Sequence, residues 1–413
     1  MESSPSIIHA KELLFLLGII LATGMISGFV ARMLKVPDVV LFLLAGMALG
    51  GAGLGMIDVK VDSTLNQLLL IFGSCYILFD GGASVRLSIL KTVWPTLLII
   101  STIGVLISAF ITAYAAQYFL GLPFIFALLL GAVIASTDPA TLVPIFKQVN
   151  IRAKVAQTVM SESAFNDAMG AILTFAVLGI AMGNAGGEFS ISASLLDLLK
   201  QSLFGIAGGA ILGYLAALFI AHEKYSFLAE YAPVVTIMSV AAAYLSIDNL
   251  HASGFMAVFV FGLMLGNKEL FGFKMEQQEE AKLEDFILTT SLIMRIFIFV
   301  LLGSQVNFAL LNQYLYPALG VVAVFMLVAR PVVVFACALP DRRAKWTFEE
   351  LLFMCWTRET GVIPGALAGM LVGLKVPHSD VIASVTFMAI LITILLQATT
   401  TKWLAGKLGL LEA

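Results

Sequence analysis

The sequence Ala135-Ser-Thr-Asp-Pro-Ala140 lies in the middle of a long apolar run at about residues 122–146. Pro139 cannot donate a backbone hydrogen bond and disfavours helix at the residue before it, so a helix crossing here must break beside Asp138. A break frees backbone carbonyls and exposes the end of a half-helix, which is how transporters build ion sites near the membrane midplane. The plainer interpretation is a kinked structural helix whose second half Asp138 caps. Because capping and ion binding can coexist, we expect Asp138 to belong to a site.

The composition of the whole chain is that of a membrane protein. Of its 413 residues, 60% are hydrophobic and 12% are charged, and the mean hydropathy is +1.02. Soluble domains are about 45–50% apolar and about 25% charged. The longest strongly polar stretch, 267–285, is too short to fold by itself. The sequence therefore predicts an all-α polytopic membrane protein, with a single membrane domain over residues 1–413 and no soluble domain.

A helix needs about 20 apolar residues to cross a bilayer, and this rule predicts about thirteen spans. The expected spans are 12–31, 38–57, 65–83, 93–118, 122–146, 152–182, 195–221, 231–248, 252–267, 286–304, 314–339, 349–374 and 379–404. Most of the 23 Lys and Arg residues lie in the odd-numbered connections and the C-terminal segment. Since positive charge concentrates on the cytoplasmic side, we expect a plasma or inner membrane protein with its N-terminus outside and its C-terminus in the cytoplasm.

Four oxygen-bearing side chains crowd one turn of the sixth span, in Met160-Ser-Glu-Ser-Ala-Phe-Asn-Asp-Ala-Met169. At helical spacing Ser163 and Asp167 share one face, and Glu162 and Asn166 share the neighbouring one. Hard cations take oxygen ligands, and burial favours the protonated form of a carboxyl group. Asp167 is therefore expected to hold a proton or a cation, but not both. The alternative is a polar contact between helices.

The arginine in Val328-Ala-Arg-Pro331 lies in the middle of the eleventh span and needs a carboxylate partner. We expect Arg330 to pair with Glu162 first and with Asp138 second.

A second interrupted helix is expected in the twelfth span, at Trp356-Thr-Arg-Glu-Thr-Gly-Val-Ile-Pro364. Arg358 and Glu359 are charged, and the Gly and Pro residues that follow them supply the break. Spans five and twelve hold the same position in two groups of six spans, a pattern typical of inverted repeats, here about 12–182 and 231–404.

Two further charges have open interpretations. Arg295 is expected near one end of its span, where it either extends to the interface or takes part in transport. Asp80 is expected to end its span as a cap or turn residue, or to attract cations at a funnel. The glycines at 46, 50 and over 205–213 are expected to allow close helix packing.

The Thr137-Asp138-Pro139 break followed by Glu162-Ser163-x-x-Asn166-Asp167 resembles the cation:proton antiporter superfamily, in its NhaP/sodium–proton-exchanger branch. The resemblance covers nearly the whole chain, including Phe297-Ile-Phe-Val-Leu-Leu-Gly303. It implies an NhaA-like antiporter fold with two interrupted crossing helices. It also implies a homodimer, in which spans 1–3 and 7–10 form the dimer panel. Spans 4–6 and 11–13 would form a core bundle that moves as an elevator.

The resemblance also implies roles for individual residues. Asp167 matches the aspartate that binds sodium or a proton, and the Asn-Asp pair accompanies electroneutral one-for-one exchange. Many relatives have Gly-Leu-Arg-Gly in span twelve, whereas this chain carries the additional Glu359, which leaves potassium open as the cation. The residues expected to bind cation or proton are Asp167, Thr137, Ser163 and Asp138, and those expected to shape the site are Asn166, Glu162, Arg330, Arg358 and Glu359.

We therefore expect an antiporter that exchanges Na⁺, or Li⁺ or K⁺, for H⁺ and serves pH homeostasis. No cofactor is expected because the ion gradient drives transport. The expected partners are monovalent cations, protons, membrane lipid and a second copy of the chain, with no nucleic acid. Two other classes remain as alternatives: a cation channel, which needs rings of carbonyls or charges along a pore, and an intramembrane aspartyl protease that uses Asp80 with Asp138 or Asp167.

Overall fold

The structure of the chain, a computed structural model, describes residues 5–34, 36–60, 63–137, 146, 151–183, 191–222 and 225–412. Over these residues it is helical, with two isolated β-bridges and no strand. The α-helices are, in chain order, α1 (Pro5–Leu34), α2 (Asp38–Leu49), α3 (Thr64–Ser84), α4 (Leu87–Leu120), α5 (Phe124–Ile134), α7 (Ala153–Ala181), α8 (Ile191–Ala221), α9 (Ala232–Asp248), α10 (Gly254–Gly266), α11 (Gln277–Ser304), α12 (Phe308–Gln313), α13 (Leu315–Val324), α14 (Arg330–Ala338), α15 (Phe348–Trp356), α16 (Val362–Gly373), α17 (Ser379–Thr393) and α18 (Thr399–Lys407).

Two short π-helical turns continue the spans that they interrupt. Phe325–Ala329 joins α13 to α14, and Ile394–Ala398 joins α17 to α18. Short 3₁₀ turns at Ala229–Tyr231 and Lys268–Phe271 flank α9 and α10.

The expected spans are confirmed as helices. Within the described ranges, 9 helical stretches are long and apolar enough to cross a membrane, and four shorter apolar helices accompany them: α2, α5, α10 and α16. Each expected span overlaps one of these, but the second span is shorter than expected, because α2 ends at Leu49, and most of the second half of the fifth span lies outside the described residues. The twelfth span is interrupted as predicted, because α15 ends at Trp356 and α16 begins at Val362.

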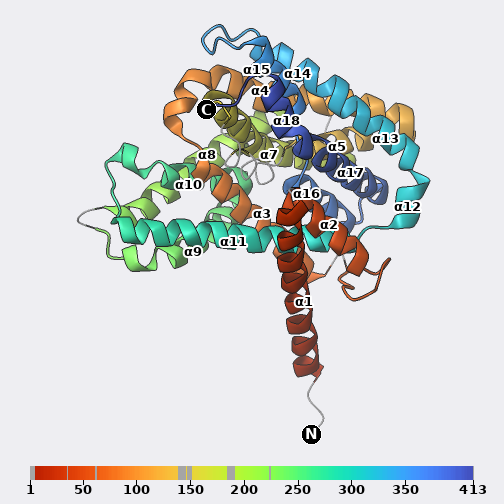
Figure 1. Cartoon of the computed structure of the whole chain (residues 1–413), viewed down its shortest axis with the longest axis horizontal. Coiled ribbons are helices and arrows are strands. Elements are labelled where there is room, and N and C mark those ends of the chain that lie inside the picture. Colours follow the sequence, from red (N-terminus) through yellow and green to blue (C-terminus); the bar gives the residue numbers. More distant parts are fainter. Residues whose placement is uncertain are drawn as a thin grey trace.

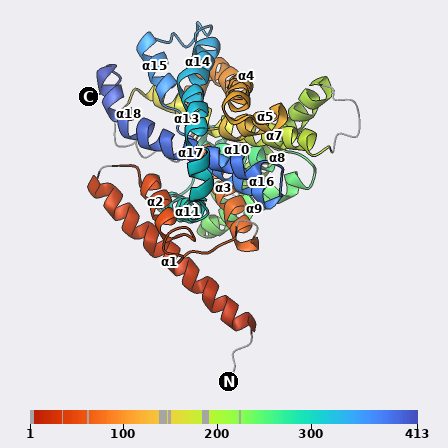
Figure 2. The same ribbon diagram turned by 90° about the vertical axis from the view of Figure 1, so that its right-hand side faces the viewer.

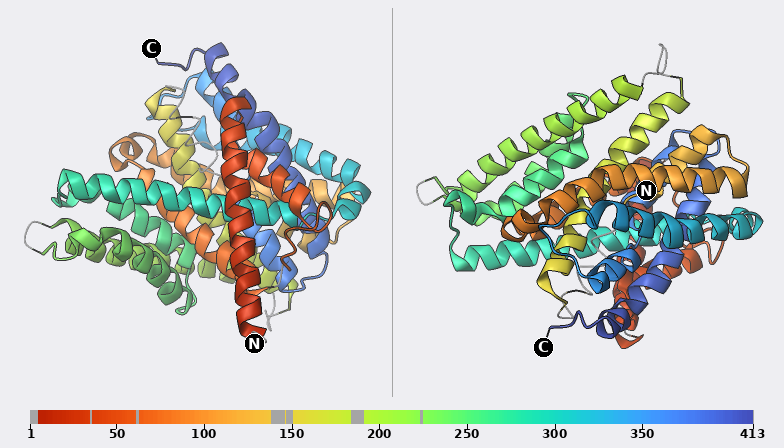
Figure 3. Two further views of the ribbon diagram at one scale, coloured as in Figure 1. Left: turned by 60° about the horizontal axis from the view of Figure 1, so that its bottom comes forward. Right: turned by 90° about the horizontal axis from the view of Figure 1, so that it is seen from above.

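The helices pack in two sets. In one set α10 lies against α3 and α8, and α11 lies against α1, α2 and α3. In the other, α4 lies against α5, α7, α13 and α14, and α16 lies against α17. Figure 1 shows α8, α9 and α10 on one side of the molecule and α12, α13 and α17 on the other. α1 projects beyond the rest of the molecule towards the N-terminus (Figures 1 and 2), and many of the other long helices run roughly along a common direction (Figure 3).

Glycines permit the closest helix contacts, as predicted. A Cβ on Gly46 would clash with the carbonyl oxygen of Val300 in α11, and a Cβ on Gly209 would clash with that of Ala257 in α10. Small residues at these positions let the helix backbones touch, which replaces the missing hydrophobic driving force between helices in lipid.

The connection between α14 and α15 is hydrogen-bonded to α4 at the residue that follows a proline within that helix. Pro95 interrupts the hydrogen-bond pattern of α4, and both the backbone N–H and the hydroxyl of Thr96 donate to Asp341 Oδ2, at 3.2 and 2.6 Å. Trp346 Nε1 donates to the Thr96 hydroxyl at 2.9 Å. Burial alone would raise the pKa of Asp341, but hydrogen bonds from Thr96 and from the Arg343 and Ala344 backbone hold this pKa below its ordinary value.

Two expectations about charged residues are wrong. Asp80 does not end its helix, because α3 continues to Ser84, and the Ser291 hydroxyl of α11 donates to Asp80 Oδ2 at 2.7 Å. Arg295 is half-buried in the interior of α11 rather than near an end, since the helix runs from Gln277 to Ser304. Neither error comes from the expected ends of the spans, since α3 and the C-terminal end of α11 agree with them to within one residue. Asp80 has a partner, Ser291, on a helix distant in sequence, and the sequence does not show that contact.

Candidate ion-binding site

The first interruption is held against α7 by neutral hydrogen bonds. α5 ends at Ile134, and Thr137 lies beyond it in non-helical backbone. The Thr137 N–H donates to Asn166 Oδ1 at 3.0 Å, and Asn166 Nδ2 donates to the Thr137 hydroxyl at 2.9 Å. That hydroxyl in turn donates to Ser163 Oγ at 2.7 Å. An amide suits this position because it accepts and donates at once, and it satisfies a backbone N–H that the broken helix leaves open.

Asp167 lies on the face of α7 that meets the end of α5. Ser163 precedes it by one turn and contacts Thr137, whereas Gly170 follows it by three residues. A Cβ on Gly170 would lie 3.0 Å from the Cβ of Ser136, so this glycine lets the interruption approach the helix closely. Since residues at i, i+4 and i+7 share a face, Asp167 is directed towards the same segment.

Glu162 points to the other side, where it binds Arg330 of α14. Both guanidinium nitrogens contact the carboxylate, with Nη2 at 2.9 Å from Oε2 and a second contact between Nη1 and Oε1. Arg330 Nε donates to the Met354 carbonyl at 2.8 Å. The predicted pairing of Glu162 with Arg330 is confirmed, in the bidentate geometry that suits a buried ion pair.

Arg358 links the two interruptions. From the 357–361 segment its guanidinium donates to Ser108 Oγ of α4 at 2.9 Å and to the carbonyl of Ala135 at the end of α5. The same group lies over the Phe325 ring, 4.6 Å from its centroid. A cation at this point complements the negative end of the α5 dipole and one of its open carbonyls.

Glu359 faces the last span rather than α7. Thr401 Oγ1 of α18 lies 3.5 Å from Glu359 Oε1, and the neighbouring Thr360 N–H donates to Thr393 Oγ1 of α17 at 3.0 Å. Every expected site residue that the structure describes is at most 3% exposed.

The structure brings together eight of the nine expected site residues around the two interruptions, and the ninth, Asp138, lies outside the described residues, as do Pro139 and Pro144. Sequence reasoning missed Ser108 and the polar face of the last span. That face had a signal, because Thr393, Gln397 and Thr401 recur every four residues along the last span. Ser108 had none, since one serine in a long span is unremarkable.

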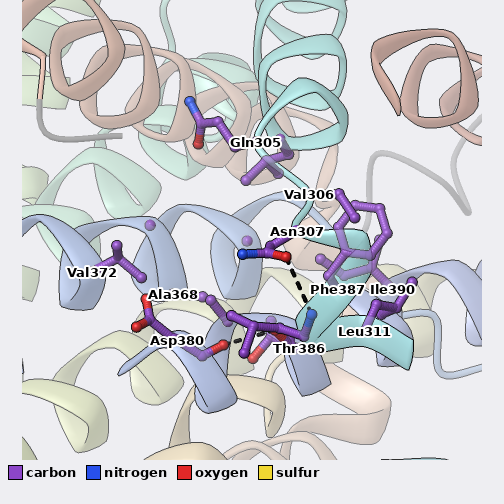
Figure 4. A pocket seen from close by; sticks show the side chains of 16 residues that line it. Gln305, Val306, Asn307, Leu311, Ala368, Val372, Asp380, Thr386, Phe387 and Ile390 are labelled. Carbon is purple, nitrogen blue, oxygen red and sulfur yellow. Dashed lines mark hydrogen bonds between the residues drawn. The ribbon is translucent and has the colours of Figure 1, made fainter. Parts of the chain in front are cut away.

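A cavity of about 210 Å³ lies between the end of α11, α12, α16 and α17. Figure 4 shows Gln305, Asn307 and Asp380 around an otherwise mostly apolar lining. The Asn307 side chain caps α12 by accepting from the Ala309 and Leu310 N–H groups. The lining reaches Gly365 in the first turn of α16, so the cavity approaches the second interruption.

The groups at the first interruption are suited to binding a small, hard cation. Hydroxyl, amide and carboxylate oxygens from α5 and α7 converge beside a buried acid, and a fixed arginine–glutamate pair lies next to them. Such a site can exchange a dehydrated monovalent cation for a proton on one carboxylate. Buried acids beside interrupted helices are typical of the ion sites of secondary transporters.

Comparison with known proteins identifies the family. Residues 18–407 match the family described as sodium/hydrogen exchanger, transmembrane. Na⁺/H⁺ antiporter 1 of Methanocaldococcus jannaschii is 32% identical, with 95% of each chain covered. The K⁺/H⁺ antiporter NhaP of Alkalimonas amylolytica is 28% identical over 95% of this chain and 66% of its own length. The solved structure of the sodium proton antiporter MjNhaP1 from M. jannaschii at pH 8 matches with a TM-score of 0.83 and 30% identity, covering 96% of this chain and 99% of that one.

The chain therefore belongs to the sodium/hydrogen exchanger family, in the NhaP branch of the cation:proton antiporters. It is a multi-pass membrane protein and a secondary active transporter, not an enzyme, so the protease and channel alternatives are wrong.

Proposed function

We propose that the chain exchanges Na⁺ for H⁺, one for one, by competition at Asp167. The observation that carries this proposal is that two buried carboxylates of α7, Glu162 and Asp167, lie in different surroundings. Arg330 binds both oxygens of Glu162, which commits that charge to a fixed pair. Asp167 is the other buried carboxylate of this helix segment, on the face towards Thr137 and Ser163, and it takes up a proton or a cation.

The proposed cation ligands are Asp167, Ser163 and Thr137, with Asp138 as a further member of the site. Asn166 keeps the Thr137 backbone in place through its amide. Because one carboxylate serves both ions, binding of one requires release of the other, which couples their opposite movement without any cofactor.

Alternating access by an elevator movement is supported by the way the helices pack. The site residues that the structure describes belong to the set built on α4, α5, α7 and α13 to α18, whereas α1 to α3 and α8 to α11 form the second set. The cavity between α11–α12 and α16–α17 lies at the border of the two sets, where a moving core would open a path. A homodimer through the second set is supported by the apolar surface that α1 leaves uncovered, since only 17% of its most apolar window is buried.

K⁺/H⁺ exchange is the second candidate. It is favoured by the relative named a K⁺/H⁺ antiporter and by the additional carboxylate of Glu359 beside the second interruption. The positive-inside distribution supports a plasma or inner membrane location with the C-terminus in the cytoplasm.

The test is transport by the purified protein in liposomes that contain a pH dye. A pH gradient is imposed, the voltage is clamped, and Na⁺, Li⁺ or K⁺ is added separately. Collapse of the gradient with one cation, unchanged by voltage and lost in Asp167→Asn, is the expected result. Collapse that depends on voltage would contradict one-for-one exchange, and silence with every cation would contradict the proposed function.

A further inference from the structure

We propose that Ser136, in the first interruption, is a further ligand of the transported cation and helps to set which cation the site prefers. The inference deepens the proposed function and rests on it, because the ion concerned is the one that Asp167 takes up. It adds an oxygen from the α5 side of the site to those of Thr137 and Ser163.

The interruption follows the face of α7 that carries Asp167. The Thr137 hydroxyl donates to Ser163 Oγ at 2.7 Å. A Cβ on Gly170 would lie 3.0 Å from the Cβ, 3.4 Å from the Oγ and 3.6 Å from the backbone nitrogen of Ser136. Ser163 and Gly170 are about 10 Å apart along the helix, and Asp167 lies between them on the same face. The two hydroxyl-bearing residues of the interruption therefore lie on either side of Asp167 along the helix axis.

The hydroxyl of Ser136 is not committed to any side chain or backbone group. Ser136 is fully buried, and its Oγ has no hydrogen-bond partner in the part of the chain that the structure describes. The Thr137 hydroxyl, in contrast, donates to Ser163 and accepts from Asn166 Nδ2. Buried polar atoms almost always have a partner, so the Ser136 hydroxyl indicates a guest at this position.

The position of the hydroxyl, rather than a count of charges, identifies the guest. A hydroxyl both donates and accepts, so it suits a cation, a water or a protonated acid. Ser136 lies beside the acid that takes up the ion, and hard cations accept neutral oxygen ligands. When Asp167 carries the proton instead, the same hydroxyl can bond to its carboxyl group. Ser136 can thus be satisfied in both states of the exchange cycle.

The plainer alternative is a buried water between Ser136 and Thr174. Thr174 lies one turn beyond Gly170 and is buried, and its hydroxyl also lacks a partner among the described residues. A water would satisfy both hydroxyls. It would not, however, make the preference of the site for one cation over another depend on the kind of atom at position 136.

The experiment measures the half-saturating concentrations of Na⁺ and Tl⁺, as nitrate salts, for exchange by the purified full-length protein in liposomes. Ser136→Ala should raise the Na⁺ value about tenfold, as expected for the loss of one neutral ligand, with little change in the maximal rate. Ser136→Cys replaces the oxygen by sulfur, which suits soft ions better than hard ones. It should raise the Na⁺ value in the same way, while the Tl⁺ value stays at or below that of the wild type.

Ser161 provides the matched control. It is another buried serine whose Oγ has no partner in the described chain. It lies one turn before Phe165, whose ring packs against that of Phe259 in α10 with 4.7 Å between centroids, so it faces away from the interruption. Ser161→Ala and Ser161→Cys should leave both half-saturating concentrations unchanged.

An unchanged Na⁺ value in Ser136→Ala would overturn the ligand role. A Ser136→Cys protein in which the Na⁺ and Tl⁺ values change in the same proportion would also overturn it, because a water or a hydrogen bond to Asp167 does not distinguish soft from hard ions. Thermal unfolding is measured for each variant, and if Ser136→Cys is unstable, the Na⁺ value of Ser136→Ala decides the question. Failure of the proposed function is distinguishable, because it is exchange that persists in Asp167→Asn, or a wild type that is silent with every cation.

Discussion

Each of the two interrupted helices leaves backbone N–H and carbonyl groups without helical partners, and different kinds of side chain lie at the two places. At the end of α5 the hydrogen bonds are between neutral groups, since the Asn166 amide binds both the N–H and the hydroxyl of Thr137. In the 357–361 segment the side chains are charged: Arg358 reaches back to the carbonyl of Ala135, and Glu359 lies along the last span. Within the described residues, neutral side chains therefore hold the first interruption and charged side chains hold the second.

The largest expected effect comes from the acid beside the neutral interruption. Asp167→Asn keeps the shape of the side chain and removes its charge, so exchange should be abolished while thermal stability stays at or above that of the wild type, because a buried charge is lost. Proton-flux assays in liposomes and thermal unfolding in detergent measure the two. Asp80→Asn is the matched control: it is another acid in a span, bonded to Ser291 in the other helix set, and it should keep transport. Exchange that persists in Asp167→Asn would mean that the acid beside the first interruption does not carry the exchanged ions.

The next effect is on stability and concerns the buried pair of Glu162 and Arg330. Glu162→Gln leaves Arg330 buried without its charge partner, which we expect to cost about 3–5 kcal/mol of unfolding free energy. Thermal unfolding measures this loss. Replacing both partners, as Glu162→Leu with Arg330→Met, should recover most of it, because an apolar pair of similar volume has no desolvation penalty.

Glu279→Gln provides the control for that loss. Glu279 pairs with the exposed Lys282 three residues along α11, and such surface pairs contribute little to stability. A stable but inactive Glu162→Gln protein would mean that Glu162 exchanges ions itself, and the assignment of roles on α7 would be wrong.

A smaller effect is expected where the two interruptions touch. Arg358→Lys keeps the charge but loses the planar group that reaches Ser108 and Ala135 together. Loss of one charged hydrogen bond is about 1.5–3 kcal/mol, so the exchange rate should fall roughly tenfold or more with the same cation preference. Ser108→Ala removes one of the two bonds and should give an intermediate rate. Full activity in Arg358→Lys would show that the interruptions act independently.

The elements that could be predicted from sequence are those with a local signal. Span positions followed from hydropathy, and the Glu162–Arg330 pair followed from the cost of an isolated buried charge. The second interruption followed from its Gly and Pro residues. Each of these depends on residue type and spacing alone.

What could not be predicted depends on how helices distant in sequence meet. Nothing in the sequence says that Arg358 reaches the end of α5, 223 residues away, or that Thr96 of α4 binds Asp341 in the connection between α14 and α15. The π-helical turns also have no signal in the sequence, because one extra residue in a turn changes the register without changing the composition. Asp80 was misplaced for a related reason, because its partner Ser291 lies on a helix distant in sequence.

The smallest effect tests whether the charged interruption is anchored beyond the membrane. Asp341 holds the connection before α15 to Thr96 of α4, the helix that also carries Ser108. Its pKa is lower in the folded chain than in the unfolded one, so its carboxylate stabilises the fold above the ordinary aspartate pKa, and that contribution is lost as the pH falls through the folded pKa. Asp341→Asn should therefore lower stability by about 1 kcal/mol at neutral pH, a difference that closes only in strongly acidic solution. Thermal unfolding of both proteins against pH measures the gap, and Thr96→Val should reproduce part of it. A gap that already closes under mildly acidic conditions would mean that the folded carboxylate titrates near its ordinary value, and the hydrogen bonds from Thr96 would not anchor the second interruption.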